Sequence, residues 1–166
     1  MLIATGRRAA GRLGKEDRSV DMDAHTALRE SPLFATVDDE HIASLVQIAN
    51  CRTVPAETRL TIEGKDHPLA MYLILDGKVE VRREGHTIAN LGPGENFGEM
   101  ALLVPDLPRS ADVVAMSETT VLQLTAWDFA PIIRRYPEVA MAVIEQLARR
   151  LIASDHRLVE AYGQLK

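Results

Sequence analysis

Short apolar runs separated by turn signals fill the middle of the chain, from about residue 52 to residue 124. Runs of this length are typical of strands, because a helix needs a longer periodic segment. Asp76–Gly77 is a strong hairpin signal between two of the runs, and Glu84–Gly85 is a weaker one. About eight short strands at this spacing predict a small barrel or jelly roll. The predicted strands lie at Val54 and at 60–62, 71–75, 79–81, 87–89, 113–114 and 120–124.

Helical patterns flank the predicted barrel on both sides. Before it, residues 24–34 indicate a short helical lead-in, and Thr36 is a plausible N-cap for a helix that runs to about Asn50. After it, Thr125 is a plausible cap for a further helix, which we expect Trp127 to anchor to the barrel. The predicted fold class is therefore α+β and mainly β: a double-stranded β-helix or jelly-roll barrel with flanking N-terminal helices and a long C-terminal helix.

The long C-terminal helix follows Pro137 and runs nearly to the end of the chain. Its small and apolar residues recur at alternating intervals of three and four, which is the spacing of a coiled-coil heptad. This stripe could pack on the chain's own barrel, but it is longer than a small barrel can cover. We favour pairing between two chains, and hence a homodimer through this helix. The stripe comprises Ile144, Leu147, Leu151, Ser154, Leu158, Ala161 and Leu165.

The 166 residues suit a single domain, which we expect to span residues 24–166. Within it, the barrel covers about 52–124 and the C-terminal helices about 126–164. Residues 1–23 indicate a flexible tail. This tail could instead be a basic arm that contacts nucleic acid or membrane, and Met22 could be the true start of the protein. The basic residues are Arg7, Arg8, Arg12 and Lys15.

Composition limits the possible functions. A net charge of −5 argues against a general nucleic-acid binder. No apolar run approaches the ~18–20 residues that span a bilayer. The single cysteine, Cys51, excludes an intrachain disulfide and favours a reducing compartment, so we expect a cytoplasmic protein. The spacing of His, Cys, Ser and acidic residues matches neither a metal site nor a catalytic triad, so we expect no metal and no enzyme.

Two neighbouring segments, Phe97–Leu103 and Pro108–Ala111, carry groups that could bind a phosphate and a sugar hydroxyl at once. Gly98 lets the backbone approach a ligand closely, and the start of a helical turn after it offers unpaired N–H groups. Arg109 offers a planar fork of donors that fits phosphate oxygens. Glu99 can accept a hydrogen bond from a ribose hydroxyl but would repel a bare anion. A ligand that carries both groups is a nucleotide.

With the strand pattern, these residues resemble the cyclic nucleotide-binding domain family over roughly residues 28–160. A lone Phe-Gly-Glu is common by chance, but the whole set of motifs in this order is specific. The resemblance implies a sensor that binds cAMP or cGMP, catalyses nothing and signals by movement of its C-terminal helices. Besides Phe97–Ala111, the motifs are Ser31-Pro32-Leu33-Phe34, Ile62-Glu63-Gly64-Lys65-Asp66 and Leu75-Asp76-Gly77-Lys78-Val79.

The resemblance also implies a role for each residue of the candidate site. Glu99 would hold the ribose 2′-hydroxyl, with Gly98 allowing close approach. Arg109 would pair with the cyclic phosphate, aided by the Ser110 hydroxyl and by backbone N–H groups near Ala101 and Leu102. The complete candidate ligand-binding set is Ile88, Ala89, Gly98, Glu99, Met100, Ala101, Leu102, Arg109, Ser110, Ala111 and Ser154.

The long helix carries further contacts that the resemblance implies. Arg150 matches a residue that pairs with the ribose-binding glutamate. Ser154 matches an adenine-contacting hydroxyl residue, which makes cAMP a modest favourite over cGMP. Asp155 departs from the pattern of the DNA-binding members, where a hydroxyl residue at this position reaches the base from the partner chain.

Some alternatives stay open from the sequence. No second basic helix follows the long helix, so we expect no direct DNA binding, and the effector protein is unknown. The chain could be a degenerate member of the family that works as a nucleotide-independent protein-interaction or dimerisation module. It could also be the regulatory fragment of a longer protein, such as a transcription factor or channel.

Overall fold

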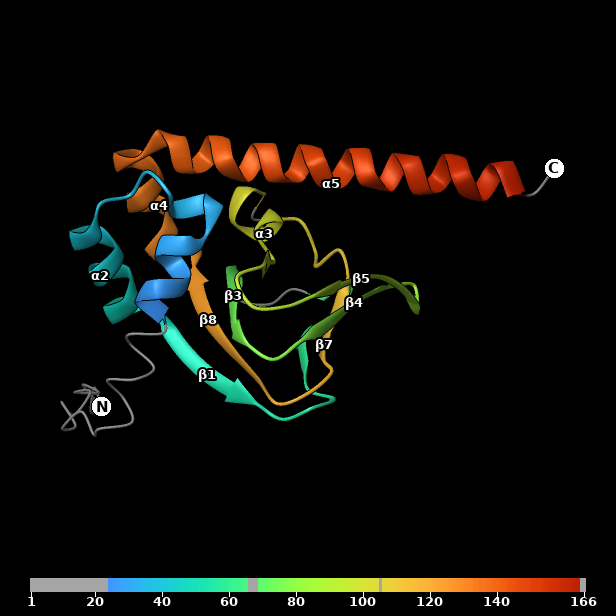
Figure 1. Ribbon diagram of the computed structural model, residues 1–166, viewed down its shortest axis with the longest axis horizontal. Coiled ribbons are helices and arrows are strands. Elements are labelled where there is room, and N and C mark those ends of the chain that lie inside the picture. The colour runs from blue at the N-terminus through green and yellow to red at the C-terminus, as the bar shows by residue number, and fades with distance from the viewer. Residues whose placement is uncertain (1–23, 66–68, 105, 165–166) are drawn as a thin grey trace, which may run out of the picture.

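The computed structural model describes residues 24–65, 69–104 and 106–164 (Figure 1). Eight strands form its centre, and helices gather at one end of them. The strands are β1 (Asn50–Val54), β2 (Arg59–Thr61), β3 (Ala70–Asp76), β4 (Val79–Arg83), β5 (His86–Leu91), β6 (Asn96–Phe97), β7 (Asp112–Ala115) and β8 (Thr119–Thr125). Beyond a helical stretch at 24–30, the helices are η1 (Pro32–Phe34), α2 (Asp39–Ile48), α3 (Met100–Leu103), α4 (Ala126–Arg135) and α5 (Pro137–Gln164).

The strands form two four-stranded sheets, in the orders β1-β8-β3-β6 and β2-β7-β4-β5. All of the pairings are antiparallel. Antiparallel sheets with flanking helices are therefore confirmed. The short strand β6 was missed from the sequence, because two residues beside glycines carry no strand periodicity.

Of the two hairpin turns predicted from the sequence, one is wrong and the other is correct. Asp76–Gly77 was the stronger prediction, but it is wrong, because β3 and β4 belong to different sheets and do not pair. Gly77 instead lets the chain cross between the sheets at φ +86°, where a Cβ would lie 2.5 Å from the carbonyl oxygen of Glu118. The weaker signal, Glu84–Gly85, is the hairpin turn: both residues have positive φ, and Arg83 pairs with His86 across it.

The core has two parts, separated by the sheet that contains β3. Alternate residues of β3 explain the division. Ala70, Tyr72 and Ile74 face between the two sheets, where Tyr72 stacks on Phe97 at 5.0 Å. Met71 and Leu73 face the helices. Because both faces of β3 are covered, this strand reads as a continuous apolar run rather than as an alternating one.

The first helices pack on the helix-facing side of that sheet. Leu28, Phe34, Ile42 and Leu45 are each 0% exposed. The sequence predicted Thr36 as the N-cap of α2, but this prediction is wrong. Asp38 occupies that position and accepts a hydrogen bond from the N–H of His41. The helix ends at Ile48 rather than near Asn50, because β1 already begins at Asn50.

The cap of α4 agrees with the prediction, whereas its first turn does not. Thr125 and Asp128 form a capping box, in which each side chain bonds the other residue's backbone N–H. Trp127 is 89% exposed, so it does not anchor α4 to the barrel. That anchor is Phe129, which is buried edge-on against Phe34.

The long helix α5 lies across the molecule and continues past the other helices (Figure 1). Val139 and Val143 are buried in the helix-facing core, and Leu147 packs partly against it. The predicted stripe therefore mixes one packed residue with exposed ones, and Leu165 lies outside the described residues. A stripe one position over is exposed throughout and keeps the same spacing. It comprises Met141, Ile144, Ala148, Leu151, Asp155, Leu158 and Tyr162.

Candidate functional site

The sharp turn between β6 and α3 is built around Gly98. Its φ is +82°, a conformation that favours glycine. A Cβ at this position would lie 2.8 Å from Nη1 of Arg109 and 2.9 Å from the carbonyl oxygen of Ala70. The sequence assigned Gly98 to close approach by a ligand. In the structure, the missing side chain first makes room for the arginine.

Arg109 lies against this turn and is only 7% exposed. Its guanidinium donates to the carbonyl oxygens of Gly98 at 3.3 Å and of Ala70 at 3.0 Å. Burial lowers the pKa of Arg109 from its ordinary value, while Tyr72 and Glu99 act in the opposite direction. An arginine stays protonated under such conditions, so the turn holds a shielded positive charge.

Glu99 lies next to this charge and is 2% exposed. Its Oε1 accepts from Nη1 of Arg150 at 2.6 Å, and its Oε2 accepts from the side-chain amide of Asn96 at 3.4 Å. Arg150 also donates to the carbonyl oxygen of Asn96 at 2.6 Å. The predicted contact between Arg150 and Glu99 is confirmed, and it joins the candidate site directly to α5.

Asn96 and Gln146 complete this junction, and sequence reasoning missed both. Asn96 is 2% exposed and accepts a hydrogen bond from the Gln146 side chain at 2.8 Å. Two spacings could have indicated them. Asn96 precedes Glu99 by three residues, and Gln146 precedes Arg150 by four, one turn earlier on the same face of α5.

The backbone N–H groups predicted to aid the phosphate already have partners. The N–H of Ala101 donates to the carbonyl oxygen of Gly98 at 3.2 Å, and that of Leu102 donates to Glu99 at 3.0 Å. A ligand must share or replace these bonds. The turn from Gly98 to Leu102 is therefore closed on itself in this structure.

The remaining residues of the motif divide into a surface pair and a buried support. Met100 is 37% exposed and Ser110 is exposed, with the serine hydroxyl 3.9 Å from the methionine sulfur. Ala101 and Ala111 are buried, and Leu102 packs partly against the core. The structure thus brings residues 98–102 and 109–111 together around one turn.

The predicted base contacts lie on β5, at Ile88 and Ala89, and further along α5, at Ser154. Ile88, on β5, is 40% exposed, and its carbonyl oxygen accepts from Nη1 of Arg157. Ser154 is exposed, and none of the hydrogen bonds found among the described residues joins it to Ile88 or Ala89. Arg157 was missed from the sequence, although it follows Arg150 by seven residues and so lies two turns along the same face of the helix.

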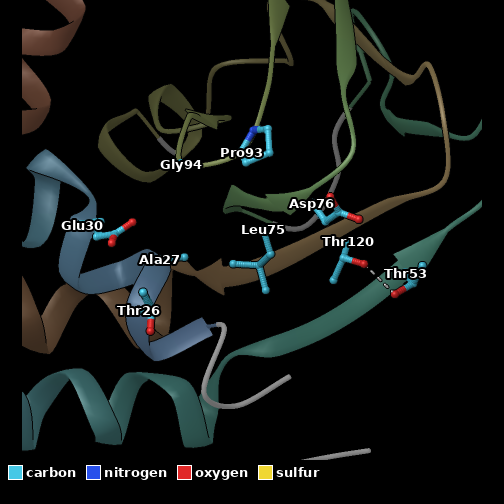
Figure 2. Close-up of a pocket in the computed structure, with 9 residues that line it drawn as sticks. All are labelled: Thr26, Ala27, Glu30, Thr53, Leu75, Asp76, Pro93, Gly94 and Thr120. Atoms are coloured by element: carbon cyan, nitrogen blue, oxygen red, sulfur yellow. Dashed lines mark hydrogen bonds between the residues drawn. The ribbon is translucent and has the colours of Figure 1, made fainter. Parts of the chain in front are cut away.

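A separate hollow of about 500 Å³ opens between the 24–30 helix and the barrel (Figure 2). None of the predicted site residues lines it. Figure 2 shows the hydroxyls of Thr53 and Thr120 bonded to each other at its edge, with Asp76 beside them. Glu30 and Asp76 make the hollow acidic, so it does not suit the phosphate of a nucleotide. Its lining residues are Thr26, Ala27, Glu30, Thr53, Leu75, Asp76, Pro93, Gly94 and Thr120.

Metal ligation and membrane spanning find no support in the described part of the chain. No group of three or more His, Cys, Asp or Glu there could hold a metal ion. None of the helices in that part is long and apolar enough to cross a membrane.

Residues 51–136 match a family model described as the cyclic nucleotide-binding domain. The Cyclic AMP receptor protein of Thermus thermophilus is 38% identical over 136 residues, which cover 79% of this chain and 62% of that protein. The chain spans from 23% to 62% of the length of the first three curated relatives that it matches.

Solved structures agree with this match. The crystal structure of the Thermus thermophilus Catabolite Activator Protein superposes with a TM-score of 0.69 at 36% identity, over 80% of this chain and 63% of that one. The regulatory domain of Toxoplasma gondii PKA, crystallised with cAMP, gives a TM-score of 0.64 at 28% identity, over 70% of this chain and 45% of that one.

Proposed function

Because the chain belongs to the cyclic nucleotide-binding domain family, we propose that it is a sensor that binds a 3′,5′-cyclic nucleotide and reports the bound state through its C-terminal helices. The observation that carries this proposal is the shielded Arg109, which donates to the Gly98 turn, together with the buried Glu99 carboxylate next to it. A cyclic nucleotide offers the matching pair of groups, an anionic phosphate and a ribose hydroxyl.

Arg109 would bind the phosphate, and Glu99 would accept from the ribose 2′-hydroxyl. The carbonyl oxygens that now hold the guanidinium keep it in place for a phosphate oxygen. The N–H groups of Ala101 and Leu102 and the Ser110 hydroxyl would join as the turn opens from its self-bonded form. Charge-assisted contacts of this kind contribute about 1.5–3 kcal/mol each, which suits micromolar affinity.

Movement of α5 would carry the signal. Glu99 accepts a hydrogen bond from Arg150 of α5. A ribose hydroxyl that binds Glu99 would therefore alter the contact that holds α5 at the site. A ligand shifts such an equilibrium only if its affinity differs between the two positions of the helix. The shared carboxylate is a direct source of that difference.

cAMP is the favoured ligand over cGMP, on the strength of Ser154 as a potential adenine contact. The strand orders support classification of the barrel as a double-stranded β-helix or jelly roll. We further propose a domain that spans 24–166, a homodimer through α5, an effector protein rather than DNA as the partner, no catalytic activity and a cytoplasmic location. The predicted tail at 1–23 lies outside the described residues.

One observation favours a second candidate function. Glu99, Ala101 and Leu102 all have hydrogen-bond partners within the chain, so the turn does not depend on a ligand to satisfy these groups. A nucleotide-independent protein-interaction or dimerisation module would have this property.

Calorimetric titration with cAMP and with cGMP tests the proposal, with 5′-AMP as a non-cyclic control. We expect micromolar binding of at least one cyclic nucleotide. Arg109→Leu should weaken binding at least tenfold, because it removes the charge that faces the phosphate. Arg134→Leu, at an exposed position on α4, serves as the matched control and should bind normally. No heat from either nucleotide at high micromolar concentration would favour the interaction module.

A further inference from the structure

Asn96 is a buried polar side chain at the point where β6 meets α5. It pairs with Leu73 of β3, and residues directly opposite on neighbouring strands point to the same face of a sheet. Because Leu73 faces the helices, Asn96 faces them too. An amide that is only 2% exposed is costly to bury unless its polar atoms have partners. The contacts of Asn96 are therefore essential to its place in the fold.

The carboxylate of Glu99 fixes the direction of the hydrogen bonds around Asn96. An ionised carboxylate only accepts, so the N–H side of the Asn96 amide faces Glu99 and the amide oxygen faces α5. Gln146 must then donate to that oxygen, and it does so at 2.8 Å. The Oε1 atom of Gln146 is buried and accepts no hydrogen bond among the described residues. The contact with Asn96 therefore sets the orientation of the Gln146 amide.

The two oxygens of Glu99 are held unequally. Oε1 accepts from the charged Arg150 guanidinium at 2.6 Å, whereas Oε2 accepts from the neutral Asn96 amide at 3.4 Å. Charge-assisted hydrogen bonds are shorter and stronger than neutral ones, and 3.4 Å is longer than an ordinary N–H···O bond. Oε2 therefore keeps the greater capacity to accept a further hydrogen bond.

We propose that a ribose 2′-hydroxyl binds at Oε2 of Glu99, and that Asn96 and Gln146 are positioning residues that hold this oxygen in place. Arg150 fixes one oxygen and the Gln146–Asn96 pair fixes the other, so α5 sets the orientation of the whole carboxylate. A carboxylate that rotates more freely loses selectivity for the hydroxyl, because a hydrogen bond needs a defined direction. The inference rests on the function proposed above and adds two residues that the function did not assign.

Comparison of a cyclic nucleotide with its 2′-deoxy analogue isolates the contribution of this hydroxyl. We expect calorimetric titration of the natural chain to give a dissociation constant at least about tenfold higher for the 2′-deoxy analogue. Gln146→Met keeps the approximate shape and removes the donor to Asn96. It should lower this ratio at least about threefold, while the affinity for the 2′-deoxy analogue stays about the same.

A matched control and a second variant separate positioning from a general structural role. Gln47→Met makes the same change at an exposed glutamine on α2 and should leave the ratio unchanged. Asn96→Ala should lower the ratio at least as much as Gln146→Met does. Adding Gln146→Met to Asn96→Ala should lower it no further, because Gln146 acts through Asn96. An unchanged ratio in Gln146→Met, or an equal loss of affinity for both nucleotides, overturns the proposal.

Urea unfolding without nucleotide tests the same contacts independently of the proposed function. No hydrogen bond joins Gln146 to Glu99 among the described residues, so Asn96 is the link between them. The effects of Gln146→Met and Glu99→Gln on the unfolding midpoint should therefore be non-additive in the natural chain and additive in Asn96→Ala. Additive effects while Asn96 is present contradict the positioning role. If no nucleotide binds at all, the sensor function and the assignment of Oε2 both fail, whereas this measurement still decides whether the pair positions the carboxylate.

Discussion

The lack of a side chain at Gly98 makes room for the Arg109 guanidinium, independently of any ligand. Nη1 of Arg109 and the carbonyl oxygen of Ala70 occupy the space that a Cβ would need, and the backbone has φ +82°. A side chain at this position therefore disturbs the site even when no nucleotide is present. Gly98 therefore has two roles that the sequence motif alone does not distinguish. It allows close approach by a ligand, and it makes room for the Arg109 guanidinium.

Gly98→Ala should lower the free energy of unfolding by about 1–3 kcal/mol, the cost of forcing a non-glycine residue into a left-handed conformation. Gly92→Ala is the control, because its φ is not positive and its Cβ would meet nothing within 4 Å. Urea unfolding of both variants without nucleotide measures the difference. Equal stability of the two would mean that the turn relaxes freely around the added methyl group.

The residues of the motif were predictable because their chemistry is local. Gly98, Glu99 and Arg109 lie within a dozen residues, and the structure brings them to one turn. Asn96, Gln146 and Arg157 were not predicted, because each acts through a contact between segments that lie far apart in the sequence. The spacing of Gln146 and Arg157 from Arg150 places them on one face of α5, but it does not indicate which surface that face contacts.

At the scale of elements, α5 is tied to the site by side chains rather than by an apolar core. Val139 and Val143 are buried in the core and Leu147 packs partly against it, whereas the side-chain hydrogen bonds that join α5 to the barrel in the described part of the chain come from Gln146, Arg150 and Arg157. Polar contacts of this kind can be exchanged for others at little net cost, whereas a packed apolar interface resists displacement. The outer half of α5 is therefore the part of the helix that a ligand could most easily move.

Arg150→Gln should uncouple α5 from the turn while leaving Arg109 in place. Hydrogen exchange along residues 146–158 should be faster than in the natural chain, and addition of saturating cyclic nucleotide should change it less. Arg149→Gln, which loses only the exposed pair with Glu145, is the matched control. An identical nucleotide response in the two variants would show that Glu99 does not communicate through Arg150.

The helices and strands differed in how well the sequence predicted them. The capping box at Thr125 was predicted correctly because a cap depends on neighbouring residues. The Asp76–Gly77 hairpin was wrong because the choice between pairing and crossing to the other sheet is made by strands β6 and β8, which pair with β3. Trp127 was assigned to the core from its apolar character, although its place in the first turn of α4 turns it outward.

At the scale of the whole molecule, one polar cluster ties the N-terminal helices to the junction between α4 and α5. The Tyr136 hydroxyl donates to Asp38, and it lies 2.8 Å from Nδ1 of His41. This hydrogen bond from Tyr136, with a smaller contribution from the His41 N–H, holds the pKa of Asp38 well below its ordinary value. The same contact with Asp38 raises the pKa of Tyr136.

The lowered pKa of Asp38 means that its ionised form stabilises the native state. This contribution is complete above the ordinary aspartate pKa of about 3.9 and is lost as the pH falls below it. Tyr136→Phe should therefore be less stable than the natural chain near neutral pH, and the gap should narrow in acid. The contribution of Tyr136 itself is present below its ordinary pKa and is lost at strongly alkaline pH.

Urea unfolding at neutral pH and at about pH 2.5 checks this expectation. Tyr162→Phe is the control, because it removes a hydroxyl from an exposed ring on α5. A gap between the natural chain and Tyr136→Phe that stays constant with pH would mean that the cluster does not depend on the charge of Asp38.

The pairing of β1 with β8 has a consequence for how such a barrel can be carried in larger proteins. Asn50, where the chain enters the barrel, pairs with Gln123, two residues before the chain leaves it. A unit whose entrance and exit are adjacent can be inserted into a longer polypeptide without separating the segments on either side. Such an arrangement allows the barrel to form part of a much longer protein, such as the relative of which this chain covers 23%. Evolution can therefore attach the same barrel to different outputs by exchanging the flanking segments, while the strands between them stay intact.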